Sequence, residues 1–208
     1  MQKIKIAMTK GRLLGHTIKL LEKAGIDCGP LKEDNRKLVF LLPDYNIEVI
    51  LLKAADVPTY VEHGVVDIGI AGKDVLLEQE KQLYEVADLK FGKCRFAVAG
   101  KPSIKDGKKH LVVATKYPNV AKRYFTEKGQ SVEIIRQEGS VELAPIMGLS
   151  DVIVDIVETG KTLKENGLIV LEKIADLSAR LILNEVSYKT KKKEMAVIID
   201  LIEKAVNI

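Results

Sequence analysis

The chain has 208 residues, 47% of them hydrophobic, which is enough for a substantial core and excludes a disordered protein. Its 33 basic and 29 acidic residues give a net charge of +4, too small for a nucleic-acid-binding surface and better suited to a small anionic ligand. Cys28 and Cys94 show no paired spacing, so the sequence predicts neither a disulfide framework nor a zinc site.

The first half of the chain alternates short apolar runs with amphipathic segments. We expect strands at residues 3–9, 37–42, 47–52 and 67–72, and helices at residues 15–25, 58–64 and 73–80. This alternation is typical of an α/β fold.

Basic residues follow the first expected strand in the segment TKGRLL, residues 9–14. Lys10, Gly11 and Arg12 stand at a helix start, and Arg36 stands just before another apolar run. Because arginine makes bidentate contacts with phosphate oxygens, Arg12 and Arg36 could hold a pyrophosphate between them. Taken singly, either arginine is also explained as a surface charge.

The segment GIAGKD, residues 69–74, resembles a P-loop only in its Gly72–Lys73 pair. A P-loop needs glycine where this chain has Asp67, and serine or threonine where it has Asp74. The segment still joins a strand to a helix, so it predicts either a second anion-facing turn or an ordinary glycine-assisted connection.

The second half repeats the pattern, with strands expected at residues 94–100, 110–116, 131–137 and 151–157. Two strands lie nearly end to end around residue 92, and a second crossing is expected near residues 174–179. We therefore expect a discontinuous first lobe, residues 1–91 and 178–208, and a second lobe, residues 92–177. Two crossings favour a hinged layout with a ligand cleft between the lobes.

The run DVIVDIV, residues 151–157, is apolar at nearly every position. This pattern predicts a strand with parallel neighbours that is covered by helices on both faces. The turn ETGKT follows, in which Thr162 and Glu165 have the spacing of a capping box, and Gly167 could end the helix. A small glycine-containing turn at a helix N-terminus can bind phosphate, although an ordinary helix cap has the same composition.

Carboxylates accompany this turn. Asp151 and Asp155 flank the residues VIV, and Glu158 enters the turn itself. Acids beside a phosphate are explained if they accept hydrogen bonds from sugar hydroxyls or hold a divalent cation. The pattern therefore predicts a phosphorylated sugar as the ligand.

Several other classes of protein lose support. The three histidines have no ligand spacing, and neither GxSxG nor GxGxxG occurs, which disfavours a hydrolase or a dinucleotide-binding fold. The lysine-rich run at residues 189–194 is better explained as a solvated helix face than as a nucleic-acid site. Neither a leader pattern nor a membrane-length apolar run is present, so we expect a soluble, cytoplasmic protein.

Taken together, the segments resemble the catalytic chain of the ATP phosphoribosyltransferase family, from TKGRLL through ADVPTYVEHGVVDIGIAGKDVLLE and GSVELAPIMGLSDVIVDIVETGKTLKENGL to RLILNEVSYK. The resemblance covers the chain nearly end to end. It implies a two-lobed fold like that of type II periplasmic binding proteins. It also implies transfer of phosphoribosyl from PRPP to N1 of the ATP adenine, the first step of histidine biosynthesis.

The resemblance also assigns roles to residues. It implies that the PRPP phosphate lies on Glu158, Thr159, Gly160, Lys161 and Thr162, with the ribose hydroxyls near Asp155. Asp151 is a further candidate for PRPP binding. Arg12 and Arg36 would contact the pyrophosphate or ATP phosphates as catalytic residues. From their positions in the sequence, Lys10, Gly11, Gly72 and Lys73 are further candidates for binding ATP or pyrophosphate. Mg²⁺ would be held by the substrate phosphates, and no dedicated protein metal site is expected.

Because the chain ends at Ile208, it is similar to the short form of the family. The resemblance then implies a separate regulatory subunit, related to histidyl-tRNA synthetase, in a hetero-octamer. The alternative from another class is a non-catalytic solute-binding or sensing module, since hinged two-lobed folds serve both purposes.

Overall fold

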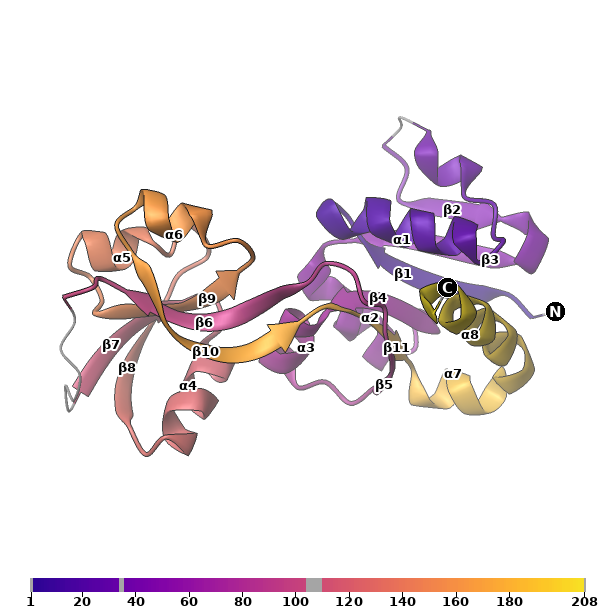
Figure 1. Ribbon diagram of the computed structural model, residues 1–208. Helices are drawn as coiled ribbons and strands as arrows, with labels where there is room; N and C mark the ends of the chain where they lie inside the picture. The colour runs from indigo at the N-terminus through magenta and orange to yellow at the C-terminus, as the bar shows by residue number, and fades with distance from the viewer. Residues whose placement is uncertain (1, 34–35, 104–109, 208) are drawn as a thin grey trace. The chain divides into compact units, whose positions relative to one another are not determined.

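The computed structural model describes residues 2–33, 36–103 and 110–207. The chain divides into two compact units. Unit 1 comprises Met1–Gly92 and Ser178–Ile208, and unit 2 comprises Lys93–Leu177. Each unit contains one β-sheet with helices on both of its faces (Figure 1), which confirms the predicted α/β class.

Unit 1 is built on a six-stranded sheet with the strand order β2-β3-β1-β4-β11-β5. Its strands are β1 (Ile4–Thr9), β2 (Val39–Leu42), β3 (Ile47–Leu52), β4 (Ile68–Gly72), β5 (Tyr84–Asp88) and β11 (Ala179–Leu183). The central strand β1 is parallel to β3 and β4, whereas β2, β5 and β11 run antiparallel to their neighbours.

The helices of unit 1 are α1 (Arg12–Lys23), α2 (Val57–Glu62), α3 (Lys73–Gln79), α7 (Glu185–Thr190) and α8 (Lys192–Asn207), with 3-10 turns η1 (Gly29–Lys32), η2 (Pro43–Tyr45) and η3 (Ala54–Asp56). Alternate residues of a strand face opposite sides, so Ile6 packs with α1 and α8 while Ala7 packs with α2. Figure 1 shows α1 and α8 on one face of this sheet and α2 and α3 on the other.

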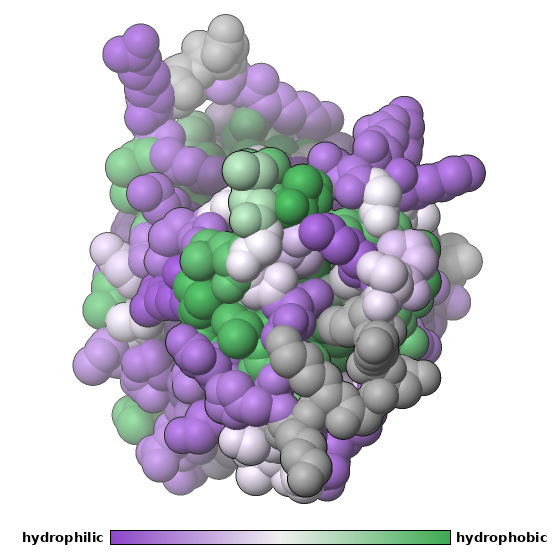
Figure 2. Space-filling view, turned by 90° about the vertical axis from the view of Figure 1, so that its left-hand side faces the viewer, coloured by the Kyte–Doolittle hydropathy of each residue, from purple (hydrophilic) through white to green (hydrophobic). Residues whose placement is uncertain are grey.

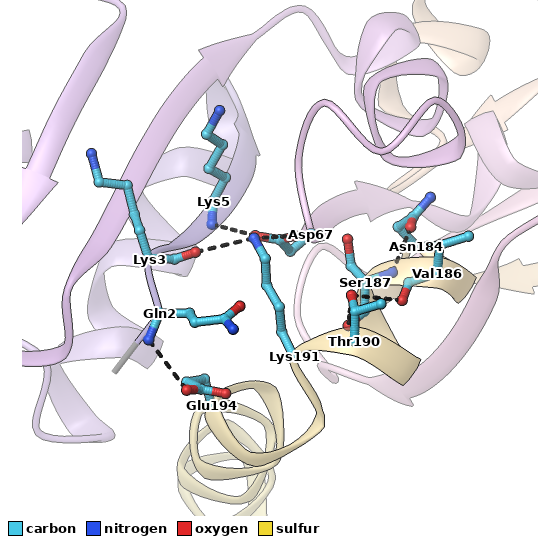
Figure 3. Close-up of polar contacts among 10 residues, drawn as sticks. All are labelled: Gln2, Lys3, Lys5, Asp67, Asn184, Val186, Ser187, Thr190, Lys191 and Glu194. Atoms are coloured by element: carbon cyan, nitrogen blue, oxygen red, sulfur yellow. Dashed lines mark hydrogen bonds and ion pairs between the residues drawn. The ribbon is translucent and has the colours of Figure 1, made fainter.

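Within unit 1, a buried carboxylate contacts both β1 and the segment between α7 and α8 (Figure 3). Asp67 is 3% exposed, and its Oδ2 accepts a hydrogen bond of 2.8 Å from the N–H of Lys5. The ammonium of Lys191 lies 2.9 Å from both oxygens of Asp67 and also donates to the carbonyl of Lys3 at 3.1 Å. Part of the lysine-rich run therefore has a structural role, which weakens its interpretation as a nucleic-acid site.

Unit 2 is built on a five-stranded sheet with the order β10-β6-β9-β7-β8. Its strands are β6 (Cys94–Gly100), β7 (His110–Thr115), β8 (Ser131–Arg136), β9 (Val152–Val157) and β10 (Ile169–Leu177), and its helices are α4 (Pro118–Glu127), α5 (Leu143–Ile146) and α6 (Lys161–Glu165). Helices α5 and α6 cover one face, and α4 covers the other (Figure 1).

The strand predicted from DVIVDIV is β9, and both of its faces are covered as predicted. Its neighbours differ from the prediction, because β9 is parallel to β7 but antiparallel to β6. The sequence pattern shows that a strand is buried on both faces, but it does not show the direction of the neighbouring strands. Strand β10 was not predicted, since edge positions leave charged side chains such as Glu172 and Asp176 exposed.

Candidate functional site: two loop edges

Parallel strands of unit 2 end at one edge of its sheet. Thr115 at the end of β7 is in register with Arg136 at the end of β8 and with Val154 of β9. Ligands of open α/β sheets bind beyond the carboxyl ends of such strands. The segment of residues 158–162, called here the 158–162 loop, leaves β9 at this edge.

The 158–162 loop is short because of Gly160. Its φ of 77° and ψ of 5° lie in the left-handed region, which glycine enters at little cost, and α6 begins at the next residue. The N–H of Lys161 donates to the hydroxyl of Thr159 at 3.3 Å. The first amides of a helix have no acceptor within the helix, so this loop presents backbone donors at an exposed turn.

The predicted capping box is wrong. Gly160 is the N-cap of α6, where the described residues provide no capping side chain, and Thr162 is the second helical residue. The carbonyl of Thr162 accepts from the side-chain amide of Asn166 at 2.8 Å, and Glu165 lies 3.8 Å from the ammonium of Lys161. Because Gly160 turns the backbone early, the helix starts before Thr162 can cap it.

The predicted helix stop at Gly167 is confirmed. Gly167 has a φ of 70°, and its N–H donates to the carbonyl of Lys164 at 3.2 Å. The N–H of Leu168 donates to the carbonyl of Leu163 at 2.9 Å. This is the bonding pattern with which a left-handed glycine ends a helix.

Two of the three predicted carboxylates lie near the loop. Asp155 is half-buried in β9, two residues before the strand ends, and its Oδ1 accepts from the N–H of Ile156 at 2.8 Å. Because side chains alternate along a strand, Asp155 shares the sheet face of Ile153 and Val157, the face that α5 and α6 cover. Glu158 is exposed in the loop itself.

Asp151 does not lie beside the loop, contrary to the prediction. It precedes β9, where its Oδ2 accepts from the N–H of Val112 at 2.9 Å and its own N–H donates to the carbonyl of Val112 at 2.8 Å. The six residues of β9 separate Asp151 from the loop by about 20 Å at roughly 3.3 Å per residue. Strand periodicity places residues 151 and 155 on one face but at different ends.

Asp151 instead lines a cavity of about 430 Å³ at the opposite edge, together with Lys101, Ser103, Val112, Pro145, Gly148, Leu149 and Ser150. Three neighbouring apolar residues, Leu143, Met147 and Leu149, are exposed by 55%, 78% and 49%. Figure 2 faces unit 2 and shows hydrophobic surface surrounded by hydrophilic residues. This edge of unit 2 therefore exposes apolar side chains near the cavity.

Unit 1 also has an edge where parallel strands end. Thr9 of β1 is in register with Leu52 of β3, and Met8 with Ile70 of β4. The structure therefore brings the predicted residues Lys10, Gly11 and Arg12, which follow β1, to the same edge as Gly72 and Lys73, which end β4 and begin α3.

Local backbone geometry at this edge depends on Gly11, whose φ of 88° and ψ of −143° form a combination that only glycine adopts readily. Lys10 is fixed to β3, because its N–H donates to the carbonyl of Leu52 at 2.9 Å. Lys10 and Arg12 are both exposed. The turn thus directs two cationic side chains to the surface beyond β1.

Arg36 approaches the same edge from a neighbouring strand. The carbonyl of Leu38 accepts from the N–H of Leu51 at 2.8 Å, so the chain enters β2 beside the end of β3. Arg36 lies two residues before this contact and is exposed. All four cations predicted from the sequence, Lys10, Arg12, Arg36 and Lys73, therefore belong to one edge of unit 1.

Sequence reasoning missed further charged residues at both edges. Lys53 follows β3 in unit 1, and Arg95 of β6 is in register with Val157 at the end of β9 in unit 2. Lys73 also has a partner that was not predicted, because its ammonium lies 2.5 Å from Oε2 of Glu85. The ends of expected parallel strands could have identified Lys53, whereas the positions of Arg95 and Glu85 depend on strand pairing.

On α4 and β10, burial raises the pKa of Tyr124, and the hydrogen bond from Lys128 lowers the pKa of Glu172. Among the residues that the structure describes, none form a group of three or more acids, histidines or cysteines able to hold a metal ion. In the same part of the chain, no helix is long and apolar enough to cross a membrane.

Comparison with known proteins identifies the family. The family model described as HisG, ATP phosphoribosyltransferase, matches residues 53–204. An ATP phosphoribosyltransferase of Alkaliphilus metalliredigens is 65% identical over 201 residues, covering 96% of both chains. One from Clostridium kluyveri is 56% identical over 211 residues, covering 99% of this chain and 95% of the relative.

Solved structures agree with this match. A chain of the ATP phosphoribosyl transferase (HisG:HisZ) complex from Thermotoga maritima has a TM-score of 0.86 and 39% identity, with 98% of both chains covered. The periplasmic aliphatic sulphonate-binding protein SsuA of Escherichia coli has a TM-score of 0.62 at 13% identity, covering 99% of this chain and 69% of SsuA. The second likeness concerns the fold alone and confirms the predicted similarity to periplasmic binding proteins.

The family model covers Lys53 after β3, Lys73 after β4 and the 158–162 loop. The relatives match nearly the whole chain, which includes the turn after β1. The chain therefore belongs to the ATP phosphoribosyltransferase family, whose members are pentosyl transferases of the first step of histidine biosynthesis.

Proposed function

We propose that this chain transfers the 5-phosphoribosyl group of PRPP to N1 of the adenine of ATP, which gives N1-(5-phosphoribosyl)-ATP and pyrophosphate. The observation that carries this proposal is the similarity to ATP phosphoribosyltransferases along nearly the whole chain, at up to 65% identity. The two loop edges support it, because they offer donors for anionic groups where α/β sheets bind ligands.

The 158–162 loop is the proposed site of the PRPP 5-phosphate. Backbone N–H groups of the loop and the hydroxyls of Thr159 and Thr162 would donate to phosphate oxygens, and Lys161 would add positive charge. The left-handed Gly160 lets the backbone approach the phosphate closely. Because α6 has only five residues, the individual donors contribute more to this proposal than a helix dipole does.

Ribose recognition is assigned to Asp155 and Glu158. Ionised carboxylates accept hydrogen bonds, and the 2- and 3-hydroxyls of ribose donate them. Asp155 shares a sheet face with α6, so it lies on the side from which the loop departs. Asp151 is left out of this proposed set because it lies at the other end of β9.

The cations of unit 1 are assigned to the remaining anionic groups. Arg12 and Arg36 would contact the pyrophosphate of PRPP or the phosphates of ATP, and Lys10, Gly11, Gly72 and Lys73 would contribute to the same region. We infer that the two units act as the two predicted lobes, residues 1–91 with 178–208 and residues 92–177, and that the second carries the PRPP loop.

The reaction needs charge stabilisation more than proton transfer. Adenine N1 already carries a lone pair, so its attack on C1 of the ribose requires no strong general base. The bond from C1 to the pyrophosphate oxygen breaks as the bond to N1 forms, and negative charge accumulates on the departing pyrophosphate. Arg12 and Arg36 would stabilise that charge with donors already in position.

Mg²⁺ is part of this proposal as an ion that the substrates bring. Held by the phosphates of PRPP and ATP, it would supply positive charge to the leaving group.

A partner subunit and a compartment belong to the same proposal. The Thermotoga maritima relative was solved as a HisG:HisZ complex. We infer that this chain likewise works with a regulatory subunit related to histidyl-tRNA synthetase, in a hetero-octamer located in the cytoplasm.

The test is product formation from ATP, PRPP and Mg²⁺ by the purified chain, with and without the partner subunit, followed by mass spectrometry. The proposal predicts N1-(5-phosphoribosyl)-ATP and one pyrophosphate for each turnover. Binding of both substrates without product, even with the partner present, would instead indicate a sensing module.

A further inference from the structure

Four charged side chains surround the start of α3 in unit 1. The ammonium of Lys73 lies 2.5 Å from Oε2 of Glu85. The guanidinium of Arg180 on β11 lies 3.4 Å from Oε1 of Glu85 and 3.3 Å from Oδ2 of Asp88. Glu85 is therefore shared by two cations, and we call Lys73, Glu85, Asp88 and Arg180 the Lys73 cluster.

Strand pairing and hydrogen bonds hold two members of the Lys73 cluster, Arg180 and Asp88, in place. Strand β11 lies between β4 and β5, with Arg180 in register with both Ala71 and Asp88. The hydroxyl of Ser178 donates to Oδ1 of Asp88 at 2.7 Å, and the N–H of Lys90 donates to the same oxygen at 2.8 Å. These contacts leave Arg180 and Asp88 little freedom to move.

Lys73 is held differently. Its backbone N–H donates to the carbonyl of Ser178 at 3.0 Å, so its main chain is fixed at the edge of the sheet. Its side chain is 26% exposed and carries the ammonium on a flexible four-carbon stem. The ammonium can therefore exchange Glu85 for another anion without any change in the backbone.

Arg180 pairs with Glu85 independently of Lys73. Its Nε is buried and has no hydrogen-bond partner among the residues that the structure describes. The guanidinium contacts Glu85 through Nη1 and Asp88 through Nη2, so it pairs with both carboxylates. If Lys73 leaves Glu85, Arg180 remains 3.4 Å from that carboxylate and still balances its charge.

We propose that Glu85 and Arg180 are positioning residues for Lys73. Glu85 holds the ammonium while no substrate anion is present, and Arg180 neutralises Glu85 when Lys73 turns to a phosphate. This inference rests on the proposed function, in which Lys73 contacts the phosphates of ATP or the pyrophosphate. Glu85 then competes with the substrate and lowers the affinity of this edge for anions.

The test is a titration of the full chain with inorganic pyrophosphate by calorimetry, together with the KM for ATP of the active enzyme. Glu85→Gln removes the competing charge, so the Kd for pyrophosphate and the KM for ATP should both fall. A partly exposed ion pair is worth about 0.2–1 kcal/mol, which corresponds to a change of about 1.4- to fivefold. The turnover number should change less than the KM, because only binding is altered.

A double-mutant cycle separates positioning from general charge effects. In a Lys73→Met background, Glu85→Gln should leave pyrophosphate affinity unchanged, because the competing partner is already absent. Arg180→Gln should weaken pyrophosphate binding in the unaltered chain but not in the Glu85→Gln background. Asp200→Asn is the matched control, since it removes one charge from an exposed pair with Lys204 on α8.

The inference fails if Glu85→Gln changes pyrophosphate affinity no more than Asp200→Asn does, or if its effect persists without Lys73. Absence of pyrophosphate binding to the unaltered chain would overturn it as well. If the chain binds pyrophosphate as described but never forms product with its partner, the proposed function fails and the positioning of Lys73 stands.

Discussion

Arg12 and Arg36 are the residues on which the proposed chemistry depends most. Removal of one preorganised donor from a developing negative charge typically lowers turnover by about 100- to 1,000-fold. We therefore expect Arg12→Ala and Arg36→Ala each to lower kcat by this factor in the assay with ATP and PRPP. Both side chains are exposed, so the melting temperature should stay close to that of the unaltered chain.

Lys204→Ala serves as the control, because it removes an exposed cation from α8, where Lys204 pairs with Asp200 at 2.7 Å. Normal turnover in both arginine variants would exclude the proposed pyrophosphate contacts.

The two cysteines should differ in reactivity. Burial raises the pKa of the Cys28 thiol from 9.0 to about 11, whereas Cys94 is half-buried. The stabilisation that the neutral Cys28 thiol provides is complete below pH 9.0 and is lost as the pH rises to about 11. At pH near 8, a thiol reagent should label Cys94 quickly and Cys28 only after denaturation.

Peptide mapping of the labelled chain distinguishes the two sites. Equal labelling rates in the folded chain would show that Cys28 is not buried as described.

The residue types of the site were predictable, but their positions were only partly so. Lys10, Arg12 and Lys73 were recognised because each follows an apolar run, and parallel strands bring such positions together. Asp151 was misplaced because strand periodicity shows which face a residue shares and not which end of the strand is near a loop. Glu85 and Arg180 could not be recognised, since antiparallel pairing of β5 and β11 brings them to Lys73.

Among the elements, the turn from β9 into α6 is the most informative. Gly160→Ala places a Cβ in the left-handed region, which costs roughly 1–2 kcal/mol. The loop should then shift its backbone donors, so we expect a raised KM for PRPP together with a lower melting temperature.

Gly129→Ala is a matched control for this loop. Gly129 also has a positive φ, 65°, with open space around it, and it lies between α4 and β8, away from the 158–162 loop. It should lower the melting temperature similarly but leave the KM for PRPP unchanged. An equal rise in the KM for PRPP in both variants would attribute the effect to general destabilisation.

Element prediction succeeded where one pattern dominated. Continuous apolar runs identified β4 and β9, and the amphipathic pattern of residues 15–25 identified α1. It failed at the start of α6, where the backbone freedom of Gly160 outweighed the capping chemistry of Thr162. It also missed β10, because charged positions on an edge strand conceal the apolar pattern.

At the scale of the whole molecule, the stability of unit 1 depends on how its C-terminal helices return to β1 and β4. Lys191 is the main cation beside the buried Asp67, whose side chain is 4% exposed. Lys191→Met would leave that carboxylate buried with fewer partners. Loss of a fully buried pair partner costs about 3–5 kcal/mol, and the partial exposure of Lys191 reduces our expectation to about 1–3 kcal/mol of unfolding free energy.

Lys193→Met is the control, because Lys193 belongs to the same lysine-rich run but is exposed on α8. Urea denaturation should show a change of under about 0.5 kcal/mol for this variant. Equal losses in the two variants would mean that the contact with Asp67 contributes little.

The central claim is that the 158–162 loop binds the 5-phosphate of PRPP, and a crystal structure of the chain with PRPP tests it directly. We expect the phosphate within hydrogen-bonding distance of the loop amides and Thr162, with the ribose hydroxyls toward Asp155. A phosphate bound elsewhere, for example in the cavity beside Asp151, with the 158–162 loop vacant, would contradict it.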